Sequence, residues 1–139
     1  MTNFDRHMQV CGAAFMTLED AVISCDHAKA GASIRVEGSW TELPVTKAEF
    51  SEEIGVRGLI TQKFEGTITK SKNDMLINLL GVMNRYGVLR VDYTNGERRV
   101  VGDDQWPVML SVSKEGDPLK VKLSLKRVTF THSRLLASL

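Results

Sequence analysis

The sequence has little of what most functional classes require. Only two of its 139 residues are cysteines, only 6% are aromatic, and the formal net charge is +1. A nucleic-acid-binding surface normally needs a clustered basic excess and aromatic side chains for stacking, so this composition argues against one. No apolar run approaches the roughly 20 residues that cross a bilayer, so we expect no membrane-spanning segment.

The two cysteines, Cys11 and Cys25, form no Cys-x-x-Cys motif. The N-terminal stretch also lacks a basic segment followed by a clean apolar one, so we expect no secretory signal. Thiols of a protein that stays in the cytoplasm remain reduced. We therefore expect two free, partly buried cysteines, and a single disulfide between them is the alternative.

Patterns of catalytic residues are absent as well. The three histidines lie in irregular or terminal stretches: His7, His27 and His132. Zinc ligation by His7 and His27 with the two cysteines finds no support in the spacing. No Gly-x-x-x-x-Gly-Lys phosphate loop and no glycine-framed serine occurs. The sequence therefore predicts no enzyme, no cofactor and no metal site.

Two groups of acidic residues are expected to be solvated. Asp103 and Asp104 lack the dense acidic loop of a calcium site, so we expect an exposed turn there. A second group is expected to form an exposed rim: Glu49, Glu52 and Glu53.

Period-two alternation of apolar and polar residues dominates the chain from Ser33 onward. One stretch, "GLITQKFEGTIT", places five residues on one side: Ile60, Gln62, Phe64, Gly66 and Ile68. Another, "PLKVKLSLKRVTF", directs Leu119, Val121, Leu123 and Leu125 inward and Lys120, Lys122 and Lys126 outward. The alternation changes phase at Val128, so we expect a bulge near Lys126 and Arg127.

The segment "DYTNGERRVVGDDQWPVML" at 92–110 predicts a hairpin. Asn95-Gly96 between alternating runs is typical of a two-residue type I′ turn, which would put Asp92 opposite Arg99. Four apolar residues would then share one face: Leu89, Val91, Tyr93 and Val100. A polar turn follows, and Trp106-Pro107 favours an extended start of the next strand.

One amphipathic helix is predicted at about 71–86 by "SKNDMLINLLGVMNRYG". Ser71 begins a capping box, and Gly87 can end the helix. Four apolar residues form a single stripe: Leu76, Leu79, Leu80 and Met83. Residues 1–31 are less periodic, and predict either a short helix over "FMTLEDAV", capped by Thr17, or an irregular arm that orders against a neighbour.

Strands, then one helix, then a β-meander predict an α+β fold that is mostly β. We expect an antiparallel β-sandwich or half-barrel with the one amphipathic helix packed on it. The length fits a single domain, 1–139, in which 32–139 form the β-rich core and 1–31 form an assembly arm.

The outward lysines of the last long strand allow two interpretations. Lys120, Lys122 and Lys126 can contact a phosphate backbone or an acidic partner. Lysines on the outer face of an edge strand also prevent unwanted pairing between sheets, and this role needs no partner. The sequence favours edge protection.

From Phe50 to Phe130 the order of elements resembles a family of small phage and prophage proteins associated with tails. The similar features are the "EFSEE" strand start, the strand "LITQKFEGTI", the helix "DMLINLLGVMNRY", the segment "VLRVDYTNGERRVVGDDQWPVML" and the final lysine-alternating strand. The resemblance implies a β-sandwich with one helix that assembles into rings, as a tail tube, terminator or neck component. It carries no reactive residue, because such proteins work through their surfaces.

On this resemblance we expect a non-enzymatic virion protein, made in the bacterial host cytoplasm. Its partners would be copies of itself and other tail or neck proteins. It would contact nucleic acid only by enclosing DNA in a channel, without sequence-specific binding. The residues expected in assembly contacts are Lys120, Lys122, Lys126, Asn95, Gly96 and Trp106. A monomeric protein-binding module that uses a sheet edge or the lysine face is the alternative. A small enzyme that uses His27 or Cys25 is the third interpretation.

Overall fold

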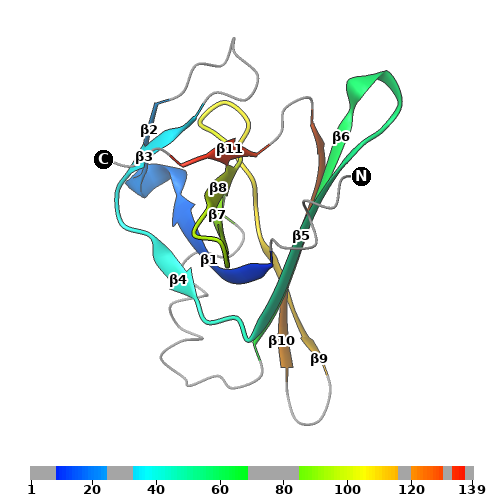
Figure 1. Ribbon diagram of the computed structural model, residues 1–139. Coiled ribbons are helices and arrows are strands. Elements are labelled where there is room, and N and C mark those ends of the chain that lie inside the picture. Colours follow the sequence, from blue (N-terminus) through cyan, green and yellow to red (C-terminus); the bar gives the residue numbers. More distant parts are fainter. Residues whose placement is uncertain (1–8, 25–32, 69–84, 116–119, 130–132, 137–139) are drawn as a thin grey trace.

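The computed structural model describes residues 9–24, 33–68, 85–115, 120–129 and 133–136, which form antiparallel β-sheets (Figure 1). The strands are β1 (Val10–Thr17), β2 (Val22–Ser24), β3 (Arg35–Glu37), β4 (Thr41–Leu43), β5 (Lys47–Ile54), β6 (Ile60–Ile68), β7 (Gly87–Tyr93), β8 (Arg98–Val101), β9 (Ser111–Glu115), β10 (Lys120–Thr129) and β11 (Arg134–Leu135). Two short 3-10 turns, η2 (Leu18–Asp20) and η3 (Val56–Gly58), lie between strands.

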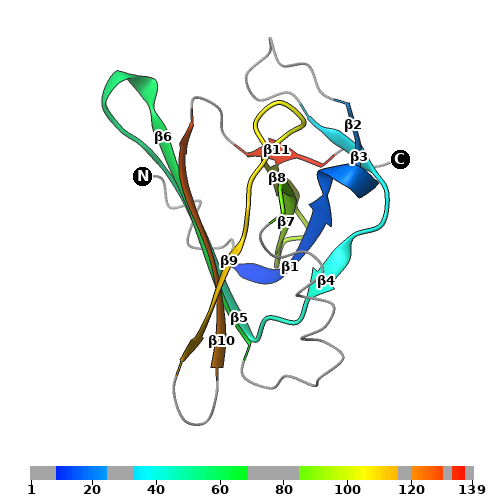
Figure 2. The ribbon, with the colours of Figure 1, turned by 180° about the vertical axis from the view of Figure 1, so that it is seen from behind.

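The strands form two packed layers and one small ribbon. Sheet I has the order β11-β8-β7-β1-β4, and sheet II has the order β5-β6-β10-β9. Figures 1 and 2 show these sheets as two layers, with the β2–β3 ribbon on the side of sheet I that faces away from sheet II. The expected mostly β, antiparallel fold is confirmed, and neither sheet closes into a barrel within the described residues.

The main core lies between sheet I and sheet II. Phe15 and Leu89 of sheet I and Phe64 and Leu123 of sheet II are fully buried there. Each strand directs every second side chain inward, because side chains alternate between the two faces of a sheet. β6 buries the five residues that its alternation predicted: Ile60, Gln62, Phe64, Gly66 and Ile68.

Sheet I is covered on its other face as well. Met16 and Val88 point to that face and form a second apolar cluster with Ile34 and Val36. A strand that is buried on both faces needs a nearly continuous apolar sequence instead of strict alternation. This explains the run "AAFM" in β1, whose last five residues, Ala13 to Thr17, are all buried.

Val10–Ser24 is part of the fold, so the expected arm over 1–31 is wrong for these residues. β1 lies in sheet I between β7 and β4. The short helix expected over "FMTLEDAV" is replaced by the end of β1, the turn η2 and the start of β2. Thr17 precedes η2, and its hydroxyl donates to Asp20 Oδ2 at 3.1 Å. Residues 1–8 and 25–31 lie outside the described residues.

The bulge expected near Lys126 is absent. β10 pairs with β6 without interruption from Val121–Ile68 to Thr129–Ile60. Val128 therefore points outward, and 59% of it is exposed. Arg127 takes the inward position, because it finds a hydrogen-bond acceptor there in Gln62 Oε1 at 2.7 Å. An exposed valine and a partly buried arginine produced the apparent change of phase.

The β7–β8 hairpin has a three-residue turn instead of a type I′ turn. Tyr93 N donates to Glu97 O at 2.9 Å, and Gly96 N donates to Tyr93 O at 3.0 Å. Gly96 has a φ of 88°, whereas Asn95 does not have the positive φ that type I′ requires. Asn95 Oδ1 instead accepts from Glu97 N at 2.9 Å. This is a type I turn followed by a left-handed glycine.

The extra turn residue shifts the register of the hairpin. Asp92 lies opposite Arg98 and not opposite Arg99. Val100 is consequently on the outer face of sheet I with the ribbon, and Val101 takes the core position beside Leu89. A shift of one residue exchanges the two faces of a strand, which is why the face assigned to Val100 was wrong.

The amphipathic helix predicted at about 71–86 lies outside the described residues, apart from its last two positions. Arg85 is in a bend and Tyr86 is in no regular element. β7 begins at Gly87, where a Cβ atom would come within 2.1 Å of Met16 O. This glycine therefore allows β7 to approach β1 closely.

Candidate functional site

The lysines of β10 do not protect an edge. β10 lies between β6 and β9 in sheet II, so its backbone is paired on both sides. Lys126 is exposed and Lys122 is half-buried on the outer face, while the side chain of Lys120 lies outside what the structure describes. The interpretation as edge protection is wrong, because it required β10 to be the outermost strand.

The outer face of sheet II carries charges of both signs. Lys126 lies opposite Lys63 of β6, and Lys63 Nζ is 3.3 Å from Glu65 Oε1. A shallow groove of about 380 Å³ runs beside these residues and is also lined by Ser111 and Ser124. One carboxylate partly offsets the two ammonium groups, so this groove has no strong basic excess.

The other expected contact residues lie on separate elements. Asn95 and Gly96 are exposed in the β7–β8 turn. Trp106 lies between β8 and β9, and 66% of it is exposed. Asn95 and Gly96 have a clear role in forming the turn, whereas the indole of Trp106 is available for contact with another molecule.

A chain of buried polar groups connects the two sheets near β11. Glu52 Oε2 of β5 accepts from Gln62 Nε2 at 2.9 Å and from Ser133 N at 2.9 Å. The hydroxyl of Ser133 donates to the other oxygen of the same carboxylate. Gln62 is fully buried, and Ser133 is nearly so. Glu52 therefore fastens the C-terminal segment to sheet II, which corrects the expected exposed position of this residue.

The chain continues through Arg127 and Asp103. Arg127 Nη1 donates to Trp106 O at 2.8 Å, and Trp106 N donates to Asp103 Oδ1 at 2.7 Å. Asp103 Oδ2 accepts from Arg134 Nη1 at 3.0 Å. Burial lowers the pKa of the Arg127 guanidinium, and the charges of Asp103 and Glu52 oppose this change. Asp103 is buried and ion-paired, so the solvated turn expected there is wrong for this residue.

These polar groups have a structural role, because they join β5, β6 and β10 to the C-terminal segment. Gln62 and Ser133 are too deeply buried for a substrate to reach them. The sequence contains one signal of this network that was not used. Gln62 is a long polar residue at an inward position of an alternating strand. Such a residue needs buried hydrogen-bond partners, so it indicates a polar network in the core.

A second buried cation lies on the outer face of sheet I. Arg90 Nη2 donates to Glu42 Oε1 at 2.6 Å, and Arg90 Nε donates to Asp92 Oδ1 at 2.9 Å. Its guanidinium carbon also lies 5.3 Å from the ring centre of Trp40. Burial alone would lower the pKa of Arg90, but the hydrogen bonds to Asp92 and Glu42 outweigh it and raise the pKa. The cluster has the character of a structural ion pair.

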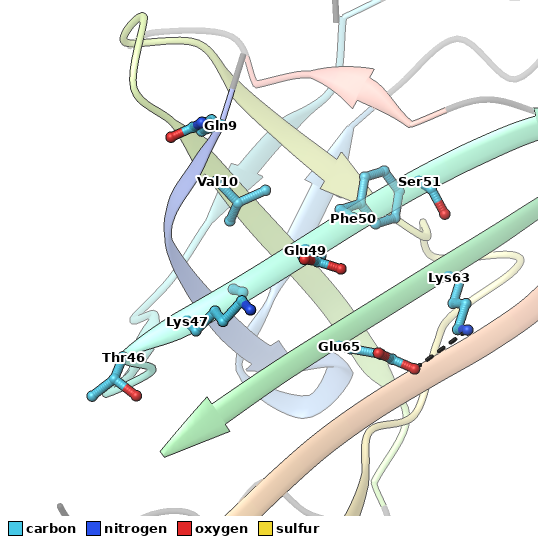
Figure 3. A pocket seen from close by; sticks show the side chains of 10 residues that line it. Gln9, Val10, Thr46, Lys47, Glu49, Phe50, Ser51, Lys63 and Glu65 are labelled. Carbon is cyan, nitrogen blue, oxygen red and sulfur yellow. Dashed lines mark ion pairs between the residues drawn. The ribbon is translucent and has the colours of Figure 1, made fainter. Parts of the chain in front are cut away.

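The edge of sheet II at β5 is the most accessible candidate for contact with another molecule. A groove of about 660 Å³ lies along this edge (Figure 3). Its walls are β5, β6 and the start of β1: Gln9, Val10, Thr46, Lys47, Ala48, Glu49, Phe50, Ser51, Lys63 and Glu65. Ala48 and Phe50 are half-buried, whereas Lys47, Glu49 and Ser51 are exposed. The groove thus combines an apolar side with a charged side.

The β5–β6 hairpin also projects beyond the two packed sheets (Figures 1 and 2). Ile54 is 69% exposed and Val56 is 82% exposed at its end. Arg57 has a φ of 65°, a left-handed conformation that is uncommon for residues other than glycine. The projecting end therefore presents apolar side chains on a sharply turned backbone.

The histidines and cysteines singled out in the sequence lie mostly outside the described residues. Four of these residues lie outside the described residues: His7, Cys25, His27 and His132. Cys11 is a free thiol as expected, but it is exposed and not partly buried. Among the described residues, no three histidine, cysteine, aspartate or glutamate side chains are placed to hold a metal ion. No helix in this part of the chain has the length and apolar character needed to cross a membrane.

Comparisons of the chain with protein-family models, with curated proteins and with solved structures found no match.

Proposed function

We propose that this protein is a non-enzymatic structural component of a phage tail or neck. It acts as a homo-oligomeric ring or as a joining piece, and it assembles through the edges of its β-sheets. The pattern of elements between Phe50 and Phe130 supports the tail assignment. The proposed assembly rests on one observation in particular, the long accessible edge of sheet II at β5.

An accessible edge favours association because its backbone groups can pair with a further strand. β5 and β9 are the two outer strands of sheet II, and successive strands of this sheet are antiparallel. β5 and β9 therefore run in opposite directions. Identical copies can pair β9 with β5 head to tail, which gives a ring if the rotation closes, or can pair the same edge about a two-fold axis. Either arrangement extends sheet II.

A second function is favoured by the groove at the same edge. Its apolar side at Phe50 and its charged side at Lys47 and Glu49 suit an extended peptide of another protein. In that case the protein is a monomeric binding module, and the strand added to β5 belongs to the partner.

The mass of the protein in solution separates the two functions. We expect light scattering on a size-exclusion column to give a discrete oligomer. Head-to-tail pairing would give rings or stacked rings in negative-stain images of that peak, whereas two-fold pairing of one edge alone would give a dimer. A monomer at every concentration up to the millimolar range, with no larger particles in the images, would contradict self-assembly and leave the binding module.

A further inference from the structure

We propose that the free edge of β5 pairs with β5 of a second copy of the chain. The two strands run antiparallel about a two-fold axis at Phe50. This inference rests on the proposed function in one respect, self-association through sheet edges. Beyond the proposed function, it specifies which strand pairs, that the partner is a second copy of the chain, and in which register the two strands lie.

Of the four sheet edges, β5 is the least protected. β4, at one edge of sheet I, has only three residues and is followed by Pro44. β8, near the other edge of sheet I, is covered by β11. β9 has five residues, whereas β5 has eight and contains no proline. Short strands, prolines, covering segments and charged side chains protect sheet edges against pairing between molecules. Among the described residues no strand covers β5, and β5 is neither short nor interrupted by proline, so its charged side chains are its remaining protection.

The hydrogen-bond pattern of the β5–β6 hairpin shows which backbone groups face the open edge. Gly55 N donates to Leu59 O at 2.7 Å at the end of the ladder. Hydrogen-bonded pairs alternate in antiparallel strands, so Glu53 and Ser51 direct their backbone groups to β6. Ala48 and Phe50 direct theirs away from it. An antiparallel copy of β5 would form about six backbone hydrogen bonds at this edge.

The charges of β5 complement each other in one register. With Phe50 opposite Phe50 of the second copy, Lys47 lies opposite Glu53, and Glu49 lies opposite Ser51. The two-fold axis repeats each pair. Lys47 and Glu53 are both exposed, and neither forms an ion pair with another described residue. Opposite charges that face each other across antiparallel strands stabilise the pairing.

The neighbouring registers with the same hydrogen-bond pattern are disfavoured by like charges. A shift in one direction places Glu49 opposite Glu49 of the second copy. A shift in the other direction places Glu49 opposite Glu53 twice. Carboxylates directly opposite each other are destabilising. The sequence of β5 therefore selects the register centred on Phe50 among those that pair most of the strand.

The groove at this edge gives the second strand a place to bind. It has a volume of about 660 Å³ and is bounded by β5 and by Gln9 and Val10 (Figure 3). The half-buried ring of Phe50 lies at the proposed axis, so two rings would meet at the centre of the contact. An apolar centre with charged pairs around it is the usual anatomy of a protein interface.

Disulfide formation reports the register directly. Glu49→Cys and Ser51→Cys are made separately in a chain that carries Cys11→Ser and Cys25→Ser. The Cα atoms of facing residues 49 and 51 would be about 4.5 Å apart, within the range that disulfides bridge. We expect mild oxidation to give covalent dimers only when the two variants are mixed.

The other outcomes overturn the inference in distinguishable ways. Dimers of Glu49→Cys alone or of Ser51→Cys alone mean that one of the neighbouring registers is formed. An oligomer in solution that gives no cross-link means that a different surface pairs, while self-assembly itself stands. A monomer at all concentrations overturns both this inference and the proposed assembly.

Charge exchange provides an independent test. We expect Lys47→Glu or Glu53→Lys alone to weaken dimerisation about thirtyfold, because the two-fold axis repeats each new like-charge pair. The double variant restores the opposite charges and should bind within about threefold of the original chain. Arg35→Glu, an exposed cation of the β2–β3 ribbon on the far side of sheet I (Figure 1), is the matched control and should leave the dimer unchanged. Dimerisation that is unaffected by the single reversals would overturn the register.

Discussion

The ion pair between Asp103 and Arg134 gives the strongest test of how β11 is held beside the segment that follows β8. Their closest oxygen and nitrogen atoms are 3.0 Å apart, and the side chains are only 4% and 5% exposed. Asp103 Oδ1 also accepts from the backbone nitrogens of Gln105 and Trp106. Asp103→Ala therefore removes a close counter-ion of a buried guanidinium and the acceptor of two backbone donors.

The expected cost follows from these contacts. Removing one partner of a buried ion pair costs about 3–5 kcal/mol. Loss of the turn acceptor adds roughly 1 kcal/mol, because water can replace part of those backbone bonds. We expect Asp103→Ala to lower the free energy of unfolding by about 4–6 kcal/mol, a large share of the roughly 5–15 kcal/mol of a typical domain. Asp103→Asn keeps an acceptor oxygen and should cost about 3 kcal/mol.

Urea unfolding followed by far-ultraviolet circular dichroism measures these differences. Glu19→Ala is the matched control, because Glu19 is 3.9 Å from Arg85 in a pair whose side chains are 82% and 56% exposed. Its removal should change the free energy of unfolding by no more than about 0.5 kcal/mol. A cost below about 1 kcal/mol for Asp103→Ala would refute the reasoning, since it would mean that solvent replaces the carboxylate.

Three further substitutions and one labelling measurement test other parts of the fold. Gly87→Ala should prevent folding, as judged by circular dichroism, because the new Cβ atom would lie 2.1 Å from a backbone oxygen. Gly96→Val should cost only about 1–2 kcal/mol in thermal unfolding, because φ is 88° but no atom lies within 4 Å of the added Cβ; a larger loss would contradict the open turn. Gln62→Leu should cost about 2–3 kcal/mol in urea unfolding, since it removes the buried partner of Arg127 and Glu52. Cys11 should react with a thiol reagent as fast in the native protein as in urea, and protection in the native state would contradict its exposure.

Local patterns in the sequence were sufficient for the elements that have one buried face. The alternation in β6 identified its inward residues, because a strand with one solvated face must alternate. The predicted type I′ turn requires a positive φ at Gly96, and the structure has one there, although the turn is of another type. The mostly β, antiparallel fold follows from such signals alone.

The register of the β7–β8 hairpin could not be obtained in the same way. Asn-Gly fits both a type I′ turn and the second half of a three-residue turn. The two differ by one residue, which exchanges the faces of Val100 and Val101. Both residues are apolar and both faces of sheet I are buried, so the sequence contains no polar residue that would reveal the error.

Carboxylates that are partly or fully buried are the second feature in which the structure differs from the sequence-based prediction. Glu52 and Asp103 look like surface residues in sequence, because a carboxylate is usually solvated. Their partners, Ser133 and Arg134, are far away in the chain and come close only when β11 binds. Contacts between residues far apart in the chain leave no local sequence pattern. The sequence alone therefore does not show that Glu52 of β5 belongs to the polar network, whereas Glu49 and Glu53 of the same strand are exposed at the candidate site.

The same C-terminal segment determines where the molecule can extend its sheets. Arg134 and Leu135 pair with β8, and Ile34 N donates to Leu135 O at 2.9 Å, so the segment is bonded on both sides. It closes one edge of sheet I, and the short strand β4 before Pro44 limits the other. Sheet I therefore has little capacity to add a strand, whereas sheet II keeps the long strand β5 at its edge. The core lies between the two sheets, whereas the groups that would pair lie along the edge at β5. Association through this edge would therefore leave the packing of the core unchanged.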